Sequence, residues 1–532
     1  MKRMIKNMMG TVCLSGVLLL SASCSDSFLQ RDALTESSSN TYWQTPNDAM
    51  MALAACYDAL QSNQLYNADQ YTLGPLYLEC ISDNGGHFNW NGWIEGYDVA
   101  MGIHNPSTWL FGDYWKACYE VINRCNLLIA NVDRVDISDG EKRMFKAEAI
   151  TLRALIYTNL TITFQDVPYL TEPLTLDNPE CAKTSRTTIV DAVLADLNKV
   201  APDLPVTADL GRITRGAAYS ILGRMALYSE RWDEAIAAYR EVQKLGYSLH
   251  PSYSSLFTLA GQNSPEIIFS VRYEGPGLSE GTAFNAHWNT PIESMNGTLN
   301  LADDYYLTDG TPVTDRNYGE MNNGVLDVTR PNAAHFANRD PRLYSTLFVP
   351  GMSWNGKGGE GNWYGGAAAS LSMVYVMKYF DPKDTGNSWD NGQDFYVVRY
   401  AEVLLSLAEA LVQKGGYDES EVIGLVNQVR QRADVNMPTV ETVEGTGLSK
   451  EKLLEIVKHE RRVELAFEGL RLFDIYRWKE LDKAVERVEN ERTSLGLSYE
   501  PRQYNGERDY VWPIPTGELD TNKLLEQHEL WK

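Results

Sequence analysis

Residues 458–478 read KHERRVELAFEGLRLFDIYRW, a stretch that combines many charges with an apolar stripe. Apolar residues recur at spacings of three and four from residue 449 to residue 478, which predicts a helix over that range. Charged side chains spaced three, four and three apart would share one face of this helix. These charged residues are Arg461, Glu464, Glu468 and Arg471.

A second charged helix is predicted at 397–413, in VVRYAEVLLSLAEAL and the residues after it. It repeats the same spacing of polar residues along one face, which allows two interpretations. One is an acid/base pair for hydrolysis. The other, which we favour, is a ladder of ion pairs that locks two helices together while the stems cover apolar surface. The residues of this second set are Arg399, Glu402, Ser406 and Glu409.

Helical periodicity extends outward from these two segments over most of the chain. Two stretches interrupt it, 61–113 and 246–396, which are rich in Gly, Asn, Asp, Pro and aromatic residues and show only short strand-like runs such as 266–273. We therefore predict a mostly α protein with two long, loop-rich insertions and a few short strands. The other predicted helices are 47–60, 114–131, 140–160, 187–200, 214–229, 232–245 and 420–432.

One pair of these helices carries a repeat signature. Leu222 and Gly223 precede Ala235 by about one helical hairpin, and Tyr239 follows four residues later. In the tetratricopeptide pattern, such small residues let two antiparallel helices approach, and a ring fills the gap between them. Pairs of this kind stack into a superhelix with a continuous core, so the predicted fold is a tetratricopeptide-like α/α superhelix.

The N-terminal segment is typical of an export signal. Basic residues precede an apolar run at 12–20, and small residues lead to Cys24. This run is shorter than the roughly 20 residues that a membrane-spanning helix needs, and no later stretch qualifies. We expect a signal peptide at 1–23. Ordinary cleavage after Ser23 is one alternative, but we favour a lipobox in which Cys24 is acylated, although Leu20 lies one residue further from Cys24 than is usual.

The composition of the chain excludes some classes of binding partner and cofactor. The 532 residues carry a formal charge of −24, which argues against nucleic acid as a partner. The scattered cysteines, with no CxxC or HExxH, indicate neither a disulfide framework nor a zinc site, and we expect no cofactor. An acidic run at 381–394 suggests calcium, but it lacks EF-hand spacing, so we favour a solvated loop. Against 14 Phe there are 30 Tyr and 13 Trp, rings that suit amphipathic ligands.

Several motifs together make a specific resemblance. The chain is similar over nearly its whole length, and in the same order, to the SusD/RagB family of nutrient-binding outer-membrane lipoproteins. Local departures, such as Gln165 and Asp166 before VPYL, concern loop geometry. The motifs are SFLQRD after Cys24, TYWQTPNDAMMALAACYDAL (41–60), YWKACYEVINRCNLLI (114–129), AEAITLRALIYTNL (147–160), VPYL (167–170), DPRL (340–343), the two charged helices and WPIPTGELDTNKLLEQ (512–527).

The resemblance implies a non-catalytic lipoprotein that faces the cell exterior from the outer membrane, captures an oligosaccharide, and delivers it to a SusC-like TonB-dependent transporter. It also implies one domain over residues 24–532. We divide this domain into a helical repeat frame (24–245), a loop-rich insertion facing the ligand (246–396) and a C-terminal helical segment (397–532).

Two clusters are the candidate ligand site. A saccharide needs rings for its C–H faces and amides or carboxylates for its hydroxyls. The resemblance adds that family members often place a ligand-contacting Asp where Asp83 stands. Each ring could instead pack the insertion onto the frame, and Trp43, Trp115, Trp478 and Trp512 are predicted to be core. The candidates are Asp83, Asn84, His87, Trp90 and Trp93 in the first cluster, and Trp288, Trp354, Trp363 and Tyr364 in the second.

Other functions remain open. The family also contains peptide-binding members, so a peptide ligand is an alternative. A glycoside hydrolase would need two carboxylates about 5 Å or roughly 6.5–9.5 Å apart, and no barrel-like alternation of strands and helices accompanies the acids here. A third possibility is a tetratricopeptide scaffold that binds only proteins.

Overall fold

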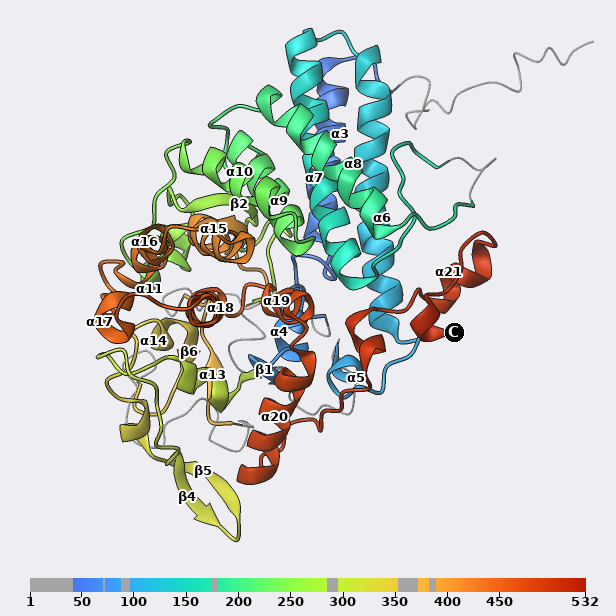
Figure 1. Cartoon of the computed structure of the whole chain (residues 1–532). Coiled ribbons are helices and arrows are strands. Elements are labelled where there is room, and N and C mark those ends of the chain that lie inside the picture. The colour runs from blue at the N-terminus through green and yellow to red at the C-terminus, as the bar shows by residue number, and fades with distance from the viewer. Residues whose placement is uncertain are drawn as a thin grey trace, which may run out of the picture.

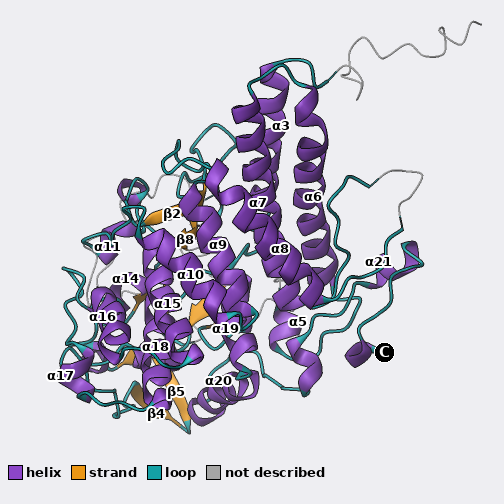
Figure 2. Ribbon diagram, turned by 45° about the horizontal axis from the view of Figure 1, so that its top comes forward, coloured by secondary structure: helices purple, strands orange, loops and turns teal. Residues whose placement is uncertain are grey.

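The computed structural model is mostly helical with few short strands, as predicted. Figure 1 shows a curved row of helices that runs from α3 to α18, and Figure 2 shows the strands among the helices from α9 onward, away from α3 and α6. Within the described residues, no helix combines the length and apolarity needed to cross a membrane. The structure describes residues 42–69, 72–87, 96–174, 180–284, 295–352, 372–381 and 389–532.

Four helices form the first part of the row. Two of them start at capping boxes, in which Thr45 pairs with Asp48 and Ser138 pairs with Glu141, satisfying N–H groups that a helix start leaves free. Helix α6 packs against α3 and α7, and α7 packs against α8. The predicted helices are confirmed here, and α6 begins somewhat earlier than predicted. Their bounds are α3 Pro46–Asp58, α6 Trp109–Asn131, α7 Asp139–Thr163 and α8 Arg186–Val200.

The predicted tetratricopeptide-like pair is the hairpin of α9 (Arg215–Tyr228) and α10 (Trp232–Gln243). A Cβ atom on Gly223 would lie 2.6 Å from Cε1 of Tyr239, so the ring occupies the space that a glycine leaves free. This is the contact that the sequence pattern predicts.

The row continues into the C-terminal segment. Helix α10 packs against α15 (Tyr400–Lys414), which packs against α16 (Glu419–Arg430) and α18 (Lys450–Leu465). Helices far apart in sequence therefore form one stack. The other α-helices in the part of the chain that the structure describes are α4 Leu76–Ile81, α5 Tyr97–Ala100, α11 Tyr253–Leu256, α13 Leu299–Asp304, α14 Leu343–Thr346, α17 Val440–Glu444, α19 Arg471–Trp478, α20 Leu481–Leu495 and α21 Thr516–Thr521.

The prediction of one unbroken helix over 449–478 is wrong. The chain leaves helical geometry after Leu465 and resumes it at Arg471, giving α18 and α19. Between them Phe467 has φ 60° and Gly469 has φ 74°, in the left-handed region where helices end. The sequence pattern hides this break because apolar residues keep spacings of three and four across it. Glu468 therefore lies in the turn, outside the face it was predicted to share.

Buried donors satisfy the end of α18. The carbonyl oxygen of Glu464 accepts hydrogen bonds from Tyr253 Oη at 3.0 Å, Arg399 Nη2 at 2.8 Å and Lys378 Nζ at 2.9 Å. Cations at this position also complement the helix dipole. Burial lowers the pKa of Lys378 to about 8, although the Glu468 carboxylate opposes this shift.

Within the described residues the strands form three small antiparallel sheets. The largest has the order β1 (Gly85–His87), β3 (Met295–Gly297), β7 (Tyr375–Val376), β6 (Leu347–Phe348). It therefore joins the two loop-rich stretches, 61–113 and 246–396, which are far apart in sequence. The third sheet is a hairpin of β4 (Gly319–Asn322) and β5 (Val325–Pro331).

The second sheet pairs β2 (Ile267–Val271) with β8 (Phe395–Arg399). Strand β2 confirms the predicted run at 266–273. The helix predicted from residue 397 begins only at Tyr400, because residues 395–399 pair with β2 instead. Aromatic and β-branched residues favour that pairing.

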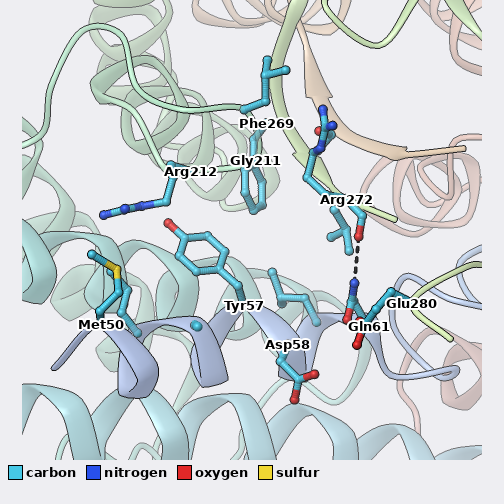
Figure 3. Close-up of a pocket in the computed structure, with 15 residues that line it drawn as sticks. Met50, Tyr57, Asp58, Gln61, Gly211, Arg212, Phe269, Arg272 and Glu280 are labelled. Carbon is cyan, nitrogen blue, oxygen red and sulfur yellow. Dashed lines mark hydrogen bonds between the residues drawn. The ribbon is translucent and has the colours of Figure 1, made fainter. Parts of the chain in front are cut away.

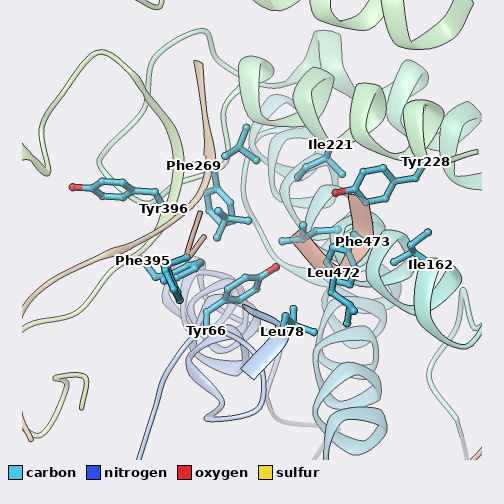
Figure 4. Close-up of a cluster of buried hydrophobic side chains, with 14 of the residues drawn as sticks. Tyr66, Leu78, Ile162, Ile221, Tyr228, Phe269, Phe395, Tyr396, Leu472 and Phe473 are labelled. Carbon is cyan, nitrogen blue, oxygen red and sulfur yellow. The ribbon is translucent and has the colours of Figure 1, made fainter. Parts of the chain in front are cut away.

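The hydrophobic core runs from Trp43 to Leu525, and one part of it lies where the helical row meets β2, β8 and α19. Figure 4 shows Phe269, Phe395 and Phe473 converging there with Tyr66 and Ile221. The core prediction for three motif tryptophans is confirmed, since Trp43, Trp115 and Trp512 have exposed fractions of 8%, 3% and 1%. The fourth, Trp478, is only partly buried, and its Nε1 donates to Glu409 at 2.8 Å.

The predicted ion-pair network is present and reaches further than the two helices. Glu464 Oε1 lies 2.7 Å from both Arg399 Nη1 and Arg432 Nη2, and its Oε2 lies 2.9 Å from Arg342 Nη1. All four side chains are at most 1% exposed. Burial alone would raise the pKa of Glu464, but the guanidinium groups outweigh burial and hold it well below its ordinary value.

Candidate functional site

Asp83, between α4 and β1, is buried among arginines and has 0% of its surface exposed. Its Oδ1 accepts from Arg471 Nε at 2.7 Å and its Oδ2 accepts from Arg487 Nε at 2.9 Å, while Arg462 Nη2 lies 3.4 Å from Oδ2. Burial would raise the pKa of Asp83, but these three guanidinium groups hold it well below its usual range. The carboxylate is therefore ionised, and both of its oxygens are bound by arginine side chains of the protein.

Asn84 and His87 are also buried, with exposed fractions of 0%. Asn84 Nδ2 donates to Glu79 Oε2 at 2.8 Å, and its Oδ1 accepts from Arg462 Nε at 3.0 Å. The backbone N–H of His87 donates to Glu500 Oε2 at 3.0 Å, and its Nδ1 lies 3.3 Å from Glu500 Oε1. Together with Asp83, these residues fix the chain up to the end of β1, where the segment 88–95 begins.

The two ends of the segment 88–95 meet at this end of β1. Gly96 has φ 84°, and a Cβ atom there would lie 3.1 Å from Ile81 Cδ1 and 3.5 Å from His87 Nε2. Glycine therefore lets the chain return next to the residue from which it left.

The described flanks of two further segments lie on the same sheet. Residues 285–294 lead into β3, and residues 353–371 connect β6 to β7. The sheet thus brings together the attachment points of three stretches that carry the predicted aromatic contacts. The aromatic candidates themselves lie outside the described residues, and their contacts stay predictions. They are Trp90, Trp93, Trp288, Trp354, Trp363 and Tyr364.

A cavity of about 850 Å³ opens beside Asp83, between α13, α20 and the segment 305–318 (Figure 1 shows these helices). We call it the arginine pocket. Two of the guanidinium groups that contact Asp83 line it. Its polar lining includes Asp304, Tyr306, Arg316, Arg462, Arg487 and Asn490.

Sequence reasoning missed this pocket. From sequence, Asp83 was predicted to contact a ligand. In the structure it is buried beneath the residues that line the pocket, and its carboxylate orients Arg487. Three separate parts of the chain supply the lining, at residues 300–318, 462 and 487–495. No single spacing could reveal that set.

A second cavity, of about 340 Å³, lies between α3 and β2 and is mostly apolar. In Figure 3, Met50 and Tyr57 rise from α3 toward Arg212, and Gln61 Nε2 donates to the Arg272 carbonyl oxygen at 2.7 Å. The Tyr57 hydroxyl is occupied, since it donates to Glu148 Oε2 at 2.5 Å. This pocket therefore offers apolar surface with few free hydrogen-bonding groups.

Among the described residues, no group of three or more His, Cys, Asp or Glu side chains could hold a metal ion. The acidic run at 381–394 falls partly outside them. The expectation of a solvated loop is wrong for Asp394, which is 0% exposed and lies 3.1 Å from Arg272 Nη1. Burial raises the pKa of Asp394 to about 6, although Arg272 opposes the shift.

The fold and the site define a tetratricopeptide-like helical repeat protein with a loop-rich face anchored on a small sheet. The chain belongs to the SusD family. The family model described as "SusD family" matches residues 265–531, and a second, described as "Starch-binding associating with outer membrane", matches residues 34–227. A SusD-like protein of Formosa agariphila is 25% identical, covering 96% of this chain and 96% of that protein.

Solved structures agree with this assignment. A SusD-like carbohydrate-binding protein of Bacteroides fragilis has a TM-score of 0.78 and 26% identity, covering 91% of this chain and 100% of that one. Surface glycan-binding protein A of Bacteroides thetaiotaomicron, in complex with laminarihexaose, has a TM-score of 0.63 and 20% identity, covering 91% and 99%. The second likeness concerns the fold alone.

Proposed function

We propose that this protein binds an oligosaccharide at the outer face of the outer membrane and passes it, without chemical change, to a SusC-like TonB-dependent transporter. Family membership and the carbohydrate-binding relatives support glycan binding. The family model's description also names association with the outer membrane. The acyl chains on Cys24 would hold the protein at that surface.

The observation that carries the proposal is the immobilised base of the 88–95 segment. Asp83 is fixed by three arginines and His87 by Glu500, so the aromatic residues beyond them start from a rigid support. A rigid support lowers the ordering cost of binding. In this proposal Asp83, Asn84 and His87 position the segment, and Trp90, Trp93, Trp288, Trp354, Trp363 and Tyr364 contact the sugar faces and hydroxyls.

Calorimetric titration of a glycan panel tests the proposal. Trp90→Ala and Trp363→Ala are each expected to weaken binding of the selected glycan about tenfold, by removing a stacking surface. Trp109→Ala is the matched control, since Trp109 is 39% exposed on α6 in the helical row. Equal affinity in all three variants would mean that the site is misplaced, and product released from the glycan would contradict a binding-only role.

Peptide binding is the second candidate function, and the apolar pocket favours it. Met50 and Leu210 expose 46% and 56% of their surface at this cavity, beside the buried Phe269. Such a lining suits an apolar amino-acid side chain better than a sugar. A peptide library that binds with micromolar affinity, and loses it in Met50→Asp, would favour this candidate over the glycan.

A further inference from the structure

Two guanidinium groups in the arginine pocket keep donors free for a ligand. Arg487 uses Nε and Nη2 on Asp83, and its side chain remains 37% exposed. Arg316 is exposed and forms no ion pair with any of the described residues. Because Asp83 fixes Arg487, the direction of its remaining N–H groups is set before a ligand arrives.

Two carboxylates of the pocket wall are already occupied by protein donors. Asp303 accepts from the Tyr318 hydroxyl at 2.5 Å and lies 2.9 Å from His335 Nε2. Glu491 accepts from the backbone N–H groups of residues 299 and 300 at 2.9 and 2.7 Å, at the start of α13. Both residues are at most 9% exposed, so neither presents an open carboxylate to the cavity.

The charges of the lining balance in number, Arg316, Arg462 and Arg487 against Asp303, Asp304 and Glu491, but they are unevenly presented to the cavity. Asp304 neutralises Arg462 through its Oδ2, and its side chain is 32% exposed. Asp83 compensates only one of the positive charges on Arg471 and Arg487. Arg316 adds another. Since the whole chain carries −24, an anion would be attracted here by these nearby groups and not by the general field of the protein.

Tyr306 supplies a fixed ring. It stacks on His459 with ring centroids 4.1 Å apart and planes inclined by 21°. His459 is itself held, with its Nε2 2.7 Å from the Asp304 carbonyl oxygen. Burial and the nearby Asp304 raise the pKa of Tyr306 to about 12, so its hydroxyl remains a donor at neutral pH. One stacked ring beside free cations suits a sugar ring that carries an acid group.

We propose that the arginine pocket is a second saccharide site, distinct from the aromatic segments, that takes an acidic sugar residue through its carboxylate. Arg316 and Arg487 would bind the carboxylate, and Tyr306 and Asn490 would meet the hydroxyls. A volume of about 850 Å³ accommodates more than one sugar residue. This inference rests on glycan binding as proposed above and adds a site and a charge class.

The test uses trimers of galacturonate, glucuronate and mannuronate, each compared with its carboxyl-reduced neutral form. We expect at least one acidic trimer to bind, and its carboxyl-reduced form to bind at least tenfold more weakly. Arg316→Gln should weaken the acidic trimer at least fivefold. Arg330→Gln is the control, because Arg330 is 65% exposed on β5, pairs with Glu320 and does not line the pocket. Tyr306→Phe should weaken binding about twofold.

Each outcome either supports or refutes the second saccharide site. If no acidic trimer binds at millimolar concentration, or if Arg316→Gln and Arg330→Gln bind equally, the second site is refuted. Retention of a neutral glycan by Arg316→Gln, together with its loss in Trp90→Ala, would show that the two sites are separate. If acidic trimers bind in an Arg316-dependent way but the tryptophan variants change nothing, the proposed aromatic site fails and the arginine pocket stands.

Discussion

Glu464 shows how a single side chain ties distant parts of this protein together. It contacts Arg342 at the start of α14, Arg399 at the end of β8 and Arg432 after α16. Each partner is buried, so none can turn to water if the carboxylate is removed. Each arginine keeps another carboxylate, Asp340 for Arg342 and Glu266 for Arg399 and Arg432. Removing Glu464 still leaves one buried positive charge in excess, and an uncompensated buried charge is costly.

The first prediction concerns this residue. Glu464→Gln is expected to lower the free energy of unfolding by about 3–5 kcal/mol, measured by urea denaturation at pH 7. Glu421→Gln, which removes the partly exposed partner of Arg240, should cost less than about 1 kcal/mol. If both variants unfolded at the same urea concentration, the network would be dispensable. If Glu464→Gln kept full stability and lost only glycan binding, its role would be functional.

At the scale of elements, close approach of helices decides how the row is built. Gly223 allows the Tyr239 ring to lie against the backbone of α9, and a side chain there would collide with it. Gly424 in α16 has the opposite setting, since a Cβ atom added there would meet nothing within 4 Å. The same substitution at the two glycines therefore separates packing from helix propensity.

The second prediction uses that contrast. Gly223→Ala should destabilise the protein by about 1–3 kcal/mol through overpacking, whereas Gly424→Ala should stabilise it by about 0.5–1 kcal/mol. Thermal unfolding followed by circular dichroism measures both. Adding Tyr239→Leu to Gly223→Ala should recover part of the loss, because it removes the colliding ring. A stabilising Gly223→Ala would disprove the tight hairpin.

For the whole molecule, buried ion pairs make stability depend on acid. Glu460, Glu464 and Glu468 have pKa values below the ordinary 4.5, because neighbouring cations outweigh the effect of burial. A carboxyl with a lowered folded pKa stabilises the fold above its unfolded pKa. That stabilisation is lost as the pH falls through the folded value. Asp394 acts oppositely, since its pKa of about 6 favours the fold in its protonated form.

The third prediction is a steep loss of stability in acid. We expect the free energy of unfolding to fall progressively as the pH drops from about 5 toward 2. The reason is that carboxyl groups with a lowered pKa, such as those of Glu460, Glu464 and Glu468, outnumber groups with a raised pKa, such as Asp394. Urea denaturation at several pH values measures the slope. Glu464→Gln should show a shallower slope, since it removes one of the linked protons. A flat profile down to pH 3 would contradict the network's ionised state.

The sequence predicted the helical row well, because the buried face of a helix is marked by apolar residues at spacings of three and four. Segments such as 187–200 and 232–245 were found within a few residues of α8 and α10. Local spacing failed at the turn around Phe467, where the apolar pattern continues although the helix stops and Lys378, from another part of the chain, donates to the carbonyl oxygens at its end. It also failed at residues 397–399, where pairing with β2 outweighs the helical pattern.

The sequence by itself determined the family, the repeat architecture and the charged motifs. Each of these can be recognised from neighbouring residues or from regular spacing along one element. The tertiary structure alone decided which charges meet and which residues face a cavity. Asp83 was found from sequence, yet only the fold placed it behind Arg487, and brought Arg316 and Tyr306 to the same cavity. Packing joins residues hundreds of positions apart, and electrostatic energy depends on that distance in space and on burial.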